Sequence, residues 1–440
     1  MKSNTVAVIG LGFVGLTLAT KLAETQRVYG VDTNPKVIKS VSEGIPHFHE
    51  ENLGPKLFQA VQSGSLSAHK DWSEVPPVDV YVVTVGTPIL NGVVNLAALD
   101  KVVGQISTRS RQSDLVIIRS TVKVGSTREA FLNAYPDGKG LPLVAMCPER
   151  TIEGSAMTEL VTLPQIVSGI NQQSLDKATH FFESFGCSVV PVSSVEAAEF
   201  AKLLNNTYRD VQFAFANEMA VVAEQLGLNV REIITAANYD YPRSNVAMPG
   251  LTGGPCLEKD PWILAESAIK VNVDARITKS SRVLHESLPA LAVSRIKQAL
   301  SSNKEFSDKN IGSISVLGLA FKGHPATDDV RGSLAKQLIQ SLRLEFPTQR
   351  ILGVDLEVSR EDALLVGVDE MVSTAEAFRS SSILIVQNNH RILAEEIRLN
   401  CATGRENPQI VFDFWGLLDP DDVDNRIELI VFGNGLKDDD

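Results

Sequence analysis

Two segments near opposite ends of the chain are almost the same. Residues 27–32 read Arg-Val-Tyr-Gly-Val-Asp, and residues 350–355 read Arg-Ile-Leu-Gly-Val-Asp. Each segment is a short apolar run that ends in an acid, and each follows an earlier apolar run, at residues 5–9 and 314–317 respectively. Short continuous apolar runs are typical of strands that are buried on both faces of a sheet. This internal repeat therefore predicts two similar units, each built on parallel strands.

A glycine-rich turn follows the first apolar run directly. Gly10, Gly12 and Gly15 have the spacing Gly-x-Gly-x-x-Gly, and a helical pattern of apolar residues comes next. In this motif the first glycine permits a tight turn, the second lets the backbone approach a pyrophosphate, and the third lets helix and strand pack closely. The helix N-terminus adds amide donors and a positive dipole. The turn predicts a dinucleotide site.

Asp32 closes the second strand at the place where such sites carry an acid, about 20 residues after the first glycine. A carboxylate there accepts from the ribose hydroxyls of adenosine and repels a 2′-phosphate. The alternative is a surface acid or a helix cap. Strand, glycines and acid together favour a cofactor site, and they favour NAD over NADP.

Further apolar runs at residues 78–83, 115–118 and 143–146 are separated by helix-length segments, and the alternation ends near residue 190. Such alternation is typical of a doubly wound parallel sheet. The second unit has the turn Gly318-x-Ala320-x-x-Gly323, in which a methyl group stands where a dinucleotide site has bare backbone. We therefore expect a different nucleotide ligand there.

Between the two units lies a helical stretch of about a hundred residues. Ser193 and Glu196 fit a capping box, and no proline or glycine follows until Gly227. This helix carries more apolar residues than one face would bury, which predicts a subunit interface and a homodimer. The expected fold is α/β, with a Rossmann domain at residues 1–190, a central helical dimerisation domain at 191–300 and a second Rossmann-like domain at 301–440.

Composition excludes several classes of protein. The 440 residues include 44% hydrophobic and 21% charged side chains, as in an ordinary globular protein, and the net charge is −12. An acidic chain without a basic stripe is not expected to bind nucleic acid. Its start lacks the pattern of a secretory signal, and no apolar run reaches membrane-spanning length. Four cysteines without a Cys-x-x-Cys pair predict reduced thiols and a cytoplasmic protein, and the scattered histidines predict no metal site.

Lys202 and Asn206 stand one helical turn apart, so both side chains leave the same face of the central helix. The alternative is a solvated lysine and an unremarkable amide. Their neighbours are alanine, leucine and phenylalanine, and a cation on an apolar helix loses solvation unless a ligand or partner meets it. We expect a ligand.

Cys256 follows Gly253, Gly254 and Pro255 in a loop and precedes Lys259 and Asp260. A cysteine can equally act as a small core hydrophobe. The other three cysteines lie beside or within apolar runs, whereas this one has a cation and an acid close by, and a nearby cation lowers a thiol pKa. The pattern favours a nucleophile.

Glu149 and Glu153 stand just past the carboxyl end of a predicted strand, at the edge where open α/β sheets bind ligands. Either acid can instead cap a helix, and Glu153 is the better candidate for a cap.

These motifs together resemble the UDP-glucose/GDP-mannose dehydrogenase family, and the likeness covers nearly the whole chain. The stretches that carry it are residues 10–15, 120–127, 148–154, 202–206, 253–260 and 320–333. The resemblance implies a four-electron oxidation of a sugar C6 alcohol to an acid, with two NAD reduced. Among the family's branches, residues 205–211 and 241–243 look most like members that act on UDP-N-acetylhexosamines such as UDP-N-acetylmannosamine or UDP-N-acetylglucosamine.

The resemblance also implies roles for single residues. Cys256 would capture the intermediate aldehyde as a thiohemiacetal, which a second hydride transfer turns into a thioester. Lys202 and Asn206 would stabilise the developing alkoxide and oxyanion. Asp260 would position the lysine or serve in proton transfer. Glu149 would act as general base for thioester hydrolysis, with Thr121 holding the water.

The same matching implies two sets of binding residues. The NAD contacts would be Gly10, Gly12, Gly15, Asp32, Thr87, Thr121, Lys259 and Arg331. The sugar nucleotide would meet Glu149, Lys202, Asn206, Arg209, Arg243, Gly253 and Lys322. In this set Arg209 would donate to the acetamido group, and Arg243 would act across the dimer.

Three alternatives remain open on the sequence. The substrate of a family member can be UDP-glucose. A two-electron hydroxyacid dehydrogenase also places a lysine and an asparagine one turn apart after a Rossmann domain, although the second Rossmann-like unit and Cys256 argue against it. A nucleotide-sensing regulator that kept the fold and lost the reaction is the third alternative.

Overall fold

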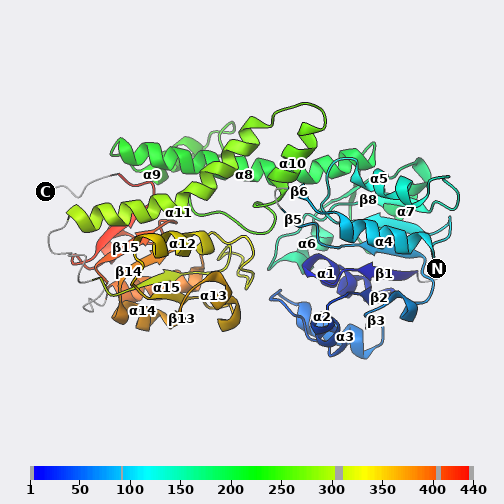
Figure 1. Ribbon diagram of the computed structural model, residues 1–440, viewed down its shortest axis with the longest axis horizontal. Helices are drawn as coiled ribbons and strands as arrows, with labels where there is room; N and C mark the ends of the chain where they lie inside the picture. Colours follow the sequence, from blue (N-terminus) through cyan, green and yellow to red (C-terminus); the bar gives the residue numbers. More distant parts are fainter. Residues whose placement is uncertain (1–3, 91–92, 303–310, 403–407, 436–440) are drawn as a thin grey trace. The chain divides into compact units, whose positions relative to one another are not determined.

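The computed structural model describes residues 4–90, 93–302, 311–402 and 408–435. The chain forms two compact units, one of residues 1–206 and 262–275 and the other of residues 207–261 and 276–440 (Figure 1). The predicted division into domains at residues 190 and 300 stays a prediction.

The first unit is built on a six-stranded sheet in the order β3-β2-β1-β4-β7-β8, in which every neighbouring pair is parallel. This is the strand order of a dinucleotide-binding Rossmann fold. Its strands are β1 (Thr5–Ile9), β2 (Arg27–Val31), β3 (Leu66–His69), β4 (Val80–Val83), β7 (Leu115–Ile118) and β8 (Leu143–Met146). Two small sheets accompany it, an antiparallel hairpin of β5 (Ile89–Leu90) and β6 (Val93–Val94) and a parallel pair of β9 (Gln165–Val167) and β10 (Val189–Pro191).

Helices cover both faces of this sheet because its strands are apolar on both sides (Figure 1). Alternate strand residues belong to different cores: Val6 and Val8 belong to one hydrophobic core, and Ala7 and Ile9 belong to another. The helices of the first unit are α1 (Phe13–Leu22), α2 (Pro35–Ser42), α3 (Leu53–Gln62), α4 (Ala97–Ser107), α5 (Ser126–Ala134), α6 (Ala156–Thr162) and α7 (Gln172–Glu183), with a 3-10 turn at Trp72–Glu74.

The second unit repeats this architecture with a sheet in the order β13-β12-β11-β14-β15-β16, again parallel throughout. Its strands are β11 (Ser313–Leu317), β12 (Ile351–Val354), β13 (Glu370–Met371), β14 (Ser381–Val386), β15 (Ile410–Asp413) and β16 (Glu428–Val431). The helices beside them are α12 (Ala335–Glu345), α13 (Arg360–Val366), α14 (Thr374–Ser380) and α15 (Arg391–Ala402), with a 3-10 turn at Pro420–Asp422. The predicted α/β fold with two Rossmann-like sheets is confirmed.

In the described residues, four helices lie between the two sheets along the chain. They are α8 (Val195–Gln225), α9 (Val230–Asn238), α10 (Asp260–Ile269) and α11 (Arg276–Ser302). Of these, α8 and α11 are the long ones. None of the helices in the described ranges is long and apolar enough to cross a bilayer.

The start of α8 corrects one sequence prediction. The capping residue is Ser194 and not Ser193, because Ser194 Oγ accepts a hydrogen bond from the Ala197 backbone N–H at 3.1 Å. Glu196 does not complete a capping box but pairs with Arg128, with Oε1 2.6 Å from Nε. The predicted helix and its end before Gly227 are nevertheless correct.

Candidate active site

The glycine turn between β1 and α1 has the geometry that a dinucleotide requires. Gly10 has a φ of 91°, a backbone conformation that residues with a side chain rarely adopt. A Cβ at Gly15 would stand 1.8 Å from the Gly10 carbonyl oxygen, so no larger residue fits between helix and strand. A Cβ at Gly12 would meet nothing within 4 Å. The backbone at Gly12 therefore faces open space beside the N-terminus of α1, and a pyrophosphate fits there.

Asp32 stands at the end of β2 and faces the same turn. Its Oδ2 accepts from the Leu11 backbone N–H at 2.8 Å, and its Oδ1 accepts from the Asn34 N–H at 2.8 Å. The helix-cap alternative for Asp32 is wrong, because the N-cap of α2 is Asn34, which accepts from the Lys36 N–H. The half-buried Asp32 carboxylate retains acceptor capacity for ribose hydroxyls.

The corresponding turn of the second unit is closed to such a ligand. Asp355 repeats the position of Asp32, and its Oδ2 accepts from the N–H groups of Leu319 and Ala320 at 2.6 and 3.1 Å. Ala320 itself is buried, and no helix follows until α12 begins at Ala335. The second turn thus lacks both the open glycine and the adjacent helix N-terminus of the first.

Thr87 and Thr121 meet in the first unit. Thr87 Oγ1 donates to the Thr121 carbonyl oxygen at 2.5 Å. The turn that follows Thr121 is held by Glu199 of α8, whose carboxylate accepts from the N–H groups of Gly125 and Thr127 at 2.6 and 2.8 Å. Burial raises the pKa of this glutamate. Helix α8 therefore fixes the loop that carries Thr121.

Glu149 follows β8 and is buried. It pairs with Arg119, which follows β7, and its Oε1 accepts from the backbone N–H groups of Arg150 and Thr151 at 2.7 and 2.9 Å. Burial by itself would raise the pKa of Glu149, but Arg119 and the backbone donors outweigh it and hold that pKa below its usual range. Glu149 is therefore ionised at neutral pH.

Glu153 does not cap a helix, contrary to the prediction from the sequence. The N-cap position of α6 is Ser155, without a side-chain hydrogen bond. The buried Glu50, from a distant loop, accepts instead from backbone N–H groups at this helix start. Its two carboxylate oxygens accept from the N–H groups of Gly154 and Met157 at 2.7 and 3.3 Å. A partner about a hundred residues away has no signature in the local sequence.

Lys202 and Asn206 lie on one face of α8 and are 8% and 7% exposed, respectively. For the Lys202 ammonium group, the described part of the chain provides no hydrogen-bond or ion-pair partner. A lysine so deeply buried normally has a counter-charge or an acceptor. The ammonium is thus available to a ligand.

Cys256 is exposed in the second unit, whereas Cys147, Cys187 and Cys401 are buried. Burial raises the pKa of the Cys147 and Cys401 thiols to about 12 and that of Cys187 to about 11. These three are poor nucleophiles at neutral pH. Among the four cysteines, accessibility favours Cys256.

The loop before Cys256 is packed closely on the segment that precedes α12. Gly254 has a φ of 102° and donates its N–H to the Gly332 carbonyl oxygen at 2.8 Å. A Cβ at Gly253 would stand 2.4 Å from that same oxygen. On the other side of Cys256, the fully buried Asp260 begins α10 and donates its N–H to the Cys256 carbonyl at 2.8 Å. The position of Cys256 is therefore set by its backbone on both sides.

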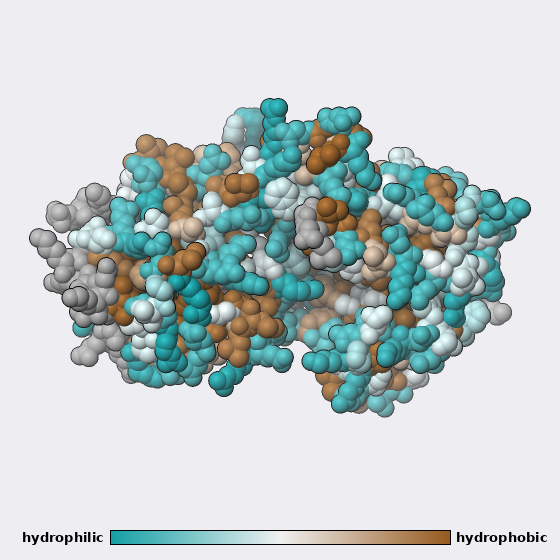
Figure 2. Space-filling view, viewed as in Figure 1, coloured by the Kyte–Doolittle hydropathy of each residue, from teal (hydrophilic) through white to brown (hydrophobic). Residues whose placement is uncertain are grey.

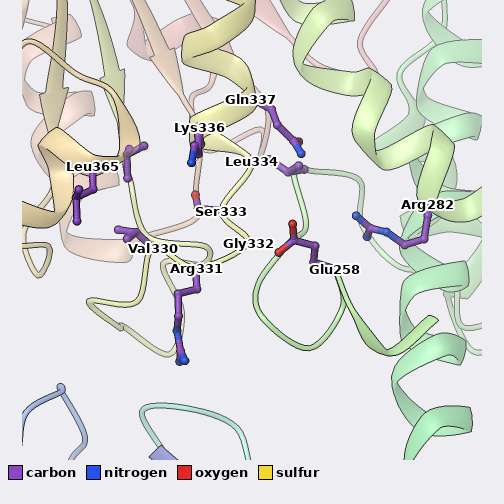
Figure 3. A pocket seen from close by; sticks show the side chains of 11 residues that line it. Glu258, Arg282, Val330, Arg331, Gly332, Ser333, Leu334, Lys336, Gln337 and Leu365 are labelled. Atoms are coloured by element: carbon purple, nitrogen blue, oxygen red, sulfur yellow. The ribbon is translucent and has the colours of Figure 1, made fainter. Parts of the chain in front are cut away.

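A pocket of about 290 Å3 lies beside this loop in the second unit. Figure 3 shows Glu258 facing Gly332, with Arg282 entering from α11 and Lys336 from α12, whereas the Arg331 side chain extends away from Lys336. Arg331 is largely exposed and pairs with Asp329, with Nη2 2.6 Å from Oδ2. Lys336 gives the lining of this pocket an exposed cation.

The remaining predicted substrate residues are also in the second unit. The Lys322 ammonium lies 5.4 Å from the centre of the Phe321 ring. Arg243 is exposed, donates to the Tyr241 hydroxyl at 3.0 Å and lies over its ring. Arg209 is exposed on α8. The structure thus groups the predicted residues in two sets. One, in the first unit, is Gly10, Gly12, Gly15, Asp32, Thr87, Thr121, Glu149, Lys202 and Asn206; the other is Arg209, Arg243, Gly253, Cys256, Lys259, Asp260, Lys322 and Arg331.

Sequence reasoning missed Arg119. This arginine is 2% exposed, its guanidinium lies 5.3 Å from the centre of the Phe182 ring, and Gln165 Oε1 accepts from it at 3.3 Å. A cation directly after a fully apolar strand was the available signal, because such a residue needs a buried partner.

The open glycine turn, the acid at the end of β2 and the Rossmann strand order define an NAD-binding protein of the dehydrogenase class. Comparison with known proteins agrees. Residues 4–185 match the model of the UDP-glucose/GDP-mannose dehydrogenase family NAD binding domain, and residues 196–286 match the central domain of the same family. The chain belongs to the UDP-glucose/GDP-mannose dehydrogenase family, and it is an NAD-dependent nucleotide-sugar dehydrogenase.

Two relatives and one solved structure illustrate the likeness. The UDP-N-acetyl-D-mannosamine dehydrogenase of Methanocaldococcus jannaschii is 33% identical over 343 residues, which cover 77% of this chain and 76% of that protein. The NDP-N-acetyl-D-galactosaminuronic acid dehydrogenase of Ralstonia nicotianae is 32% identical over 402 residues, 88% of this chain and 91% of that protein. The UDP-D-ManNAc dehydrogenase structure from Pyrococcus horikoshii superposes with a TM-score of 0.87 at 26% identity, and the alignment covers 98% and 100% of the two chains.

Proposed function

We propose that the protein oxidises a UDP-N-acetylhexosamine, UDP-N-acetylmannosamine before others, at C6 to the uronic acid, through a thioester on Cys256. The observation that carries the proposal is that one chain of this family has both an exposed Cys256 and an NAD-type glycine turn. The names of the relatives, which act on UDP-N-acetylmannosamine or on an N-acetylgalactosaminuronic acid nucleotide, support an acetamido sugar.

Oxidation of an alcohol to an acid removes two hydrides, and bound NAD supplies the acceptor for each of them. Gly10, Gly12 and Gly15 would hold its pyrophosphate, and Asp32 its adenosine ribose. Thr87, Thr121, Lys259 and Arg331 complete the proposed cofactor contacts. The open space at Gly12 supports this assignment.

Cys256 would act between the two oxidations. Its thiolate adds to the C6 aldehyde and forms a thiohemiacetal, which loses the second hydride and a proton to become a thioester. Water then cleaves the thioester, releasing the carboxylate and restoring the thiol. The exposure of Cys256 and the burial of the other three cysteines support its selection.

Lys202 and Asn206 would stabilise the charge that develops on the C6 oxygen. Lys202 is 8% exposed, and no described residue offers its ammonium group a hydrogen-bond or ion-pair partner, so a ligand oxygen would satisfy it. Asp260, at the start of α10, would orient the lysine or move the proton.

Glu149 would act as the base for the water that cleaves the thioester, and Thr121 would hold that water. Its pair with Arg119 keeps the carboxylate ionised, as a base must be, and at the same time weakens its affinity for a proton. Arg209, Arg243, Gly253 and Lys322 complete the proposed substrate contacts. Arg209 is assigned to the acetamido group, and Arg243 to a sugar nucleotide bound across the dimer.

The protein is further proposed to be a cytoplasmic homodimer that associates through its long helices. Apolar side chains exposed along α8 support the dimer. The four cysteines, none of which forms a disulfide, are compatible with a reducing compartment.

A substrate panel combined with one substitution tests the proposal. NADH formation is followed with UDP-N-acetylmannosamine, UDP-N-acetylglucosamine, UDP-N-acetylgalactosamine, UDP-glucose and GDP-mannose. We expect two NADH per UDP-N-acetylmannosamine with the native protein, and a loss of turnover of at least about a thousandfold in Cys256→Ser.

Cys187→Ser is the matched control, because this thiol is buried and has a raised pKa, and its turnover should stay near that of the native protein. One NADH per sugar with full activity in Cys256→Ser would point instead to a two-electron dehydrogenase. Binding of NAD and sugar nucleotide without any NADH would point to a regulator, and preference for UDP-glucose would correct the substrate.

A further inference from the structure

Residues 245–254, which lead to Cys256, form no helix or strand. Their backbone polar groups therefore find no partners within a regular element, and partners must come from elsewhere in the fold. Three of these residues are glycines, at 250, 253 and 254, and glycine loses more conformational freedom than other residues when it is ordered. Whatever fixes this loop also fixes the direction in which Cys256 is presented.

The first partner of the loop is Asn217 of α8. Its side-chain nitrogen donates to the Gly250 carbonyl oxygen at 3.0 Å, and its side-chain oxygen accepts from the Gly250 N–H at 2.9 Å. Asn217 is fully buried. A side-chain amide is the group that can satisfy a backbone donor and a backbone acceptor of one residue at once.

The second partner is His285 of α11, which is also fully buried. Its Nε2 lies 3.0 Å from the Asp210 backbone oxygen, an atom that can only accept, so Nε2 carries the proton. Burial lowers the pKa of His285, so the ring is neutral and Nδ1 has a free lone pair. Nδ1 lies 3.3 Å from the Thr252 hydroxyl, which therefore donates to it in a long hydrogen bond.

Asp210 contacts His285 on the side of the ring opposite to Thr252. Its carboxylate pairs with the buried Arg282, with Oδ1 2.8 Å from Nη1, and accepts from Ser281 Oγ at 2.6 Å. Because the aspartate and the arginine neutralise one another, the histidine sits beside a balanced pair and not beside a bare charge. This buried cluster contacts the cysteine loop through the hydroxyl group of Thr252.

We propose that His285 and Asn217 are positioning residues that hold the cysteine loop at Thr252 and Gly250, and so set the direction from which Cys256 attacks. The inference rests on the proposed role of Cys256. It extends that role, because it assigns a function to buried polar groups of α8 and α11 that the proposed function does not use. The backbone hydrogen bond from Gly254 to Gly332 is a third contact, so α8 holds residue 250, α11 holds residue 252 and the turn before α12 holds residue 254.

Thr252 offers the sharpest test, since its hydroxyl can be removed without changing its shape. Thr252→Val should lower kcat about tenfold with UDP-N-acetylmannosamine and NAD, with both KM values within about threefold of native, because a misdirected nucleophile affects the chemical step more than binding. Thr252→Ser keeps the hydroxyl and should keep kcat near native. Deuterium exchange of the peptide that spans residues 249–259 should be faster in Thr252→Val and native-like in Thr252→Ser.

His285→Leu tests whether the histidine acts through Thr252. If it does, the double variant with Thr252→Val loses no more kcat than His285→Leu alone, because the two changes break the same bond. Losses that multiply would overturn the inference, as would native kcat and exchange in Thr252→Val or equal damage in Thr252→Ser. If His285→Leu does not fold, the two Thr252 variants decide alone.

The exchange measurement needs no catalysis, so it separates this inference from the proposed function. Full NADH formation by Cys256→Ser would contradict the thioester mechanism. Deuterium exchange would still test whether the hydrogen bond between Thr252 and His285 holds the loop. A native exchange rate in Thr252→Val would contradict the positioning role of His285 and would leave the thioester mechanism unaffected.

Discussion

Glu149 is an ionised carboxylate in a buried position, and Arg119 is the reason. Two backbone N–H groups and one guanidinium surround it, while the arginine is itself enclosed by Gln165 and the Phe182 ring. At the scale of single residues, the site of the first unit therefore depends on a buried ion pair as well as on the proposed reacting groups. The stretch 148–154 singled out in the sequence contains Glu149, whereas Arg119 stands just before the stretch 120–127 and was missed.

Arg119→Met removes the cation and leaves the carboxylate buried without its partner. We expect a loss of about 3–5 kcal/mol in the free energy of unfolding, the usual cost of breaking a buried pair on one side. Urea unfolding measured by circular dichroism at neutral pH checks it. An unchanged midpoint would show that Glu149 finds other donors or takes up a proton.

The same pair predicts how stability depends on pH. The folded pKa of Glu149 is lowered, so its contribution is present above the unfolded pKa of about 4.3 and is lost as pH falls through the folded pKa. Glu149→Gln should therefore be less stable than the native protein at pH 7, and the difference should shrink below about pH 4. Glu183→Gln, at an exposed glutamate of α7, is the control and should run parallel to the native protein.

At the scale of elements, α8 buries several polar residues and exposes large apolar ones. Lys202, Asn206, Asp210 and Asn217 are buried among small apolar residues, mostly alanines, and the exposed residues include phenylalanine, leucine, tyrosine and valine. A surface helix ordinarily has the reverse distribution. Among these buried polar residues, Lys202 and Asn206 are proposed reacting groups. Asn217 hydrogen-bonds Gly250 of the cysteine loop, and Asp210 hydrogen-bonds His285, which contacts the same loop. The apolar face is left for a partner.

The turn between β1 and α1 allows a matched pair of substitutions. Gly12 has a φ of −69° and open space around its missing side chain, so Gly12→Val should fold with a melting temperature near native. It should bind NAD at least tenfold more weakly, a loss of about 1.4 kcal/mol or more, because its side chain occupies the place of the pyrophosphate. Titration calorimetry measures the affinity.

Gly15→Val is the counterpart, since its Cβ would stand 1.8 Å from the Gly10 carbonyl. It should lower the melting temperature strongly, because the helix must move off the strand. If Gly12→Val bound NAD as well as the native protein, the pyrophosphate would have to lie elsewhere.

At the scale of the whole molecule, the exposed apolar residues of α8 predict association. They recur every one or two helical turns on one side of the helix. Hydrophilic side chains surround the hydrophobic surface near α8 and α9 in Figure 2. The members of this stripe are Phe200, Leu204, Tyr208, Phe215, Val222 and Leu226. A stripe this long on one helix is more than isolated surface residues would give.

The variant with both Leu204→Glu and Phe215→Glu should be a monomer where the native protein is a dimer, because two buried charges per subunit would face each other across the interface. Light scattering after gel filtration gives the mass directly. Leu344→Glu, at an exposed leucine of α12, is the control and should leave the dimer intact. A native protein that is monomeric at micromolar concentration contradicts the stripe as an interface.

Sequence reasoning worked for the fold wherever the signal was periodic and local. The apolar runs at residues 115–118 and 143–146 became β7 and β8 with the same bounds. The half-buried β3, which reads Leu-Ser-Ala-His, has no such run and was missed. The capping residue of α8 was displaced by one position, since Ser193 and Ser194 both suit the motif and only backbone geometry separates them.

What the sequence determined by itself is the set of local features: strands that are apolar on both faces, a turn that requires Gly10 and Gly15, and an acid at the strand end. These depend on sterics and on hydrophobic period within a few residues. Only the tertiary structure decided which buried polar groups meet, such as Arg119 with Glu149 or His285 with Thr252. Those partners are far apart in the chain, and a hydrogen bond between them is specified by how helices and sheets pack rather than by any neighbouring residue.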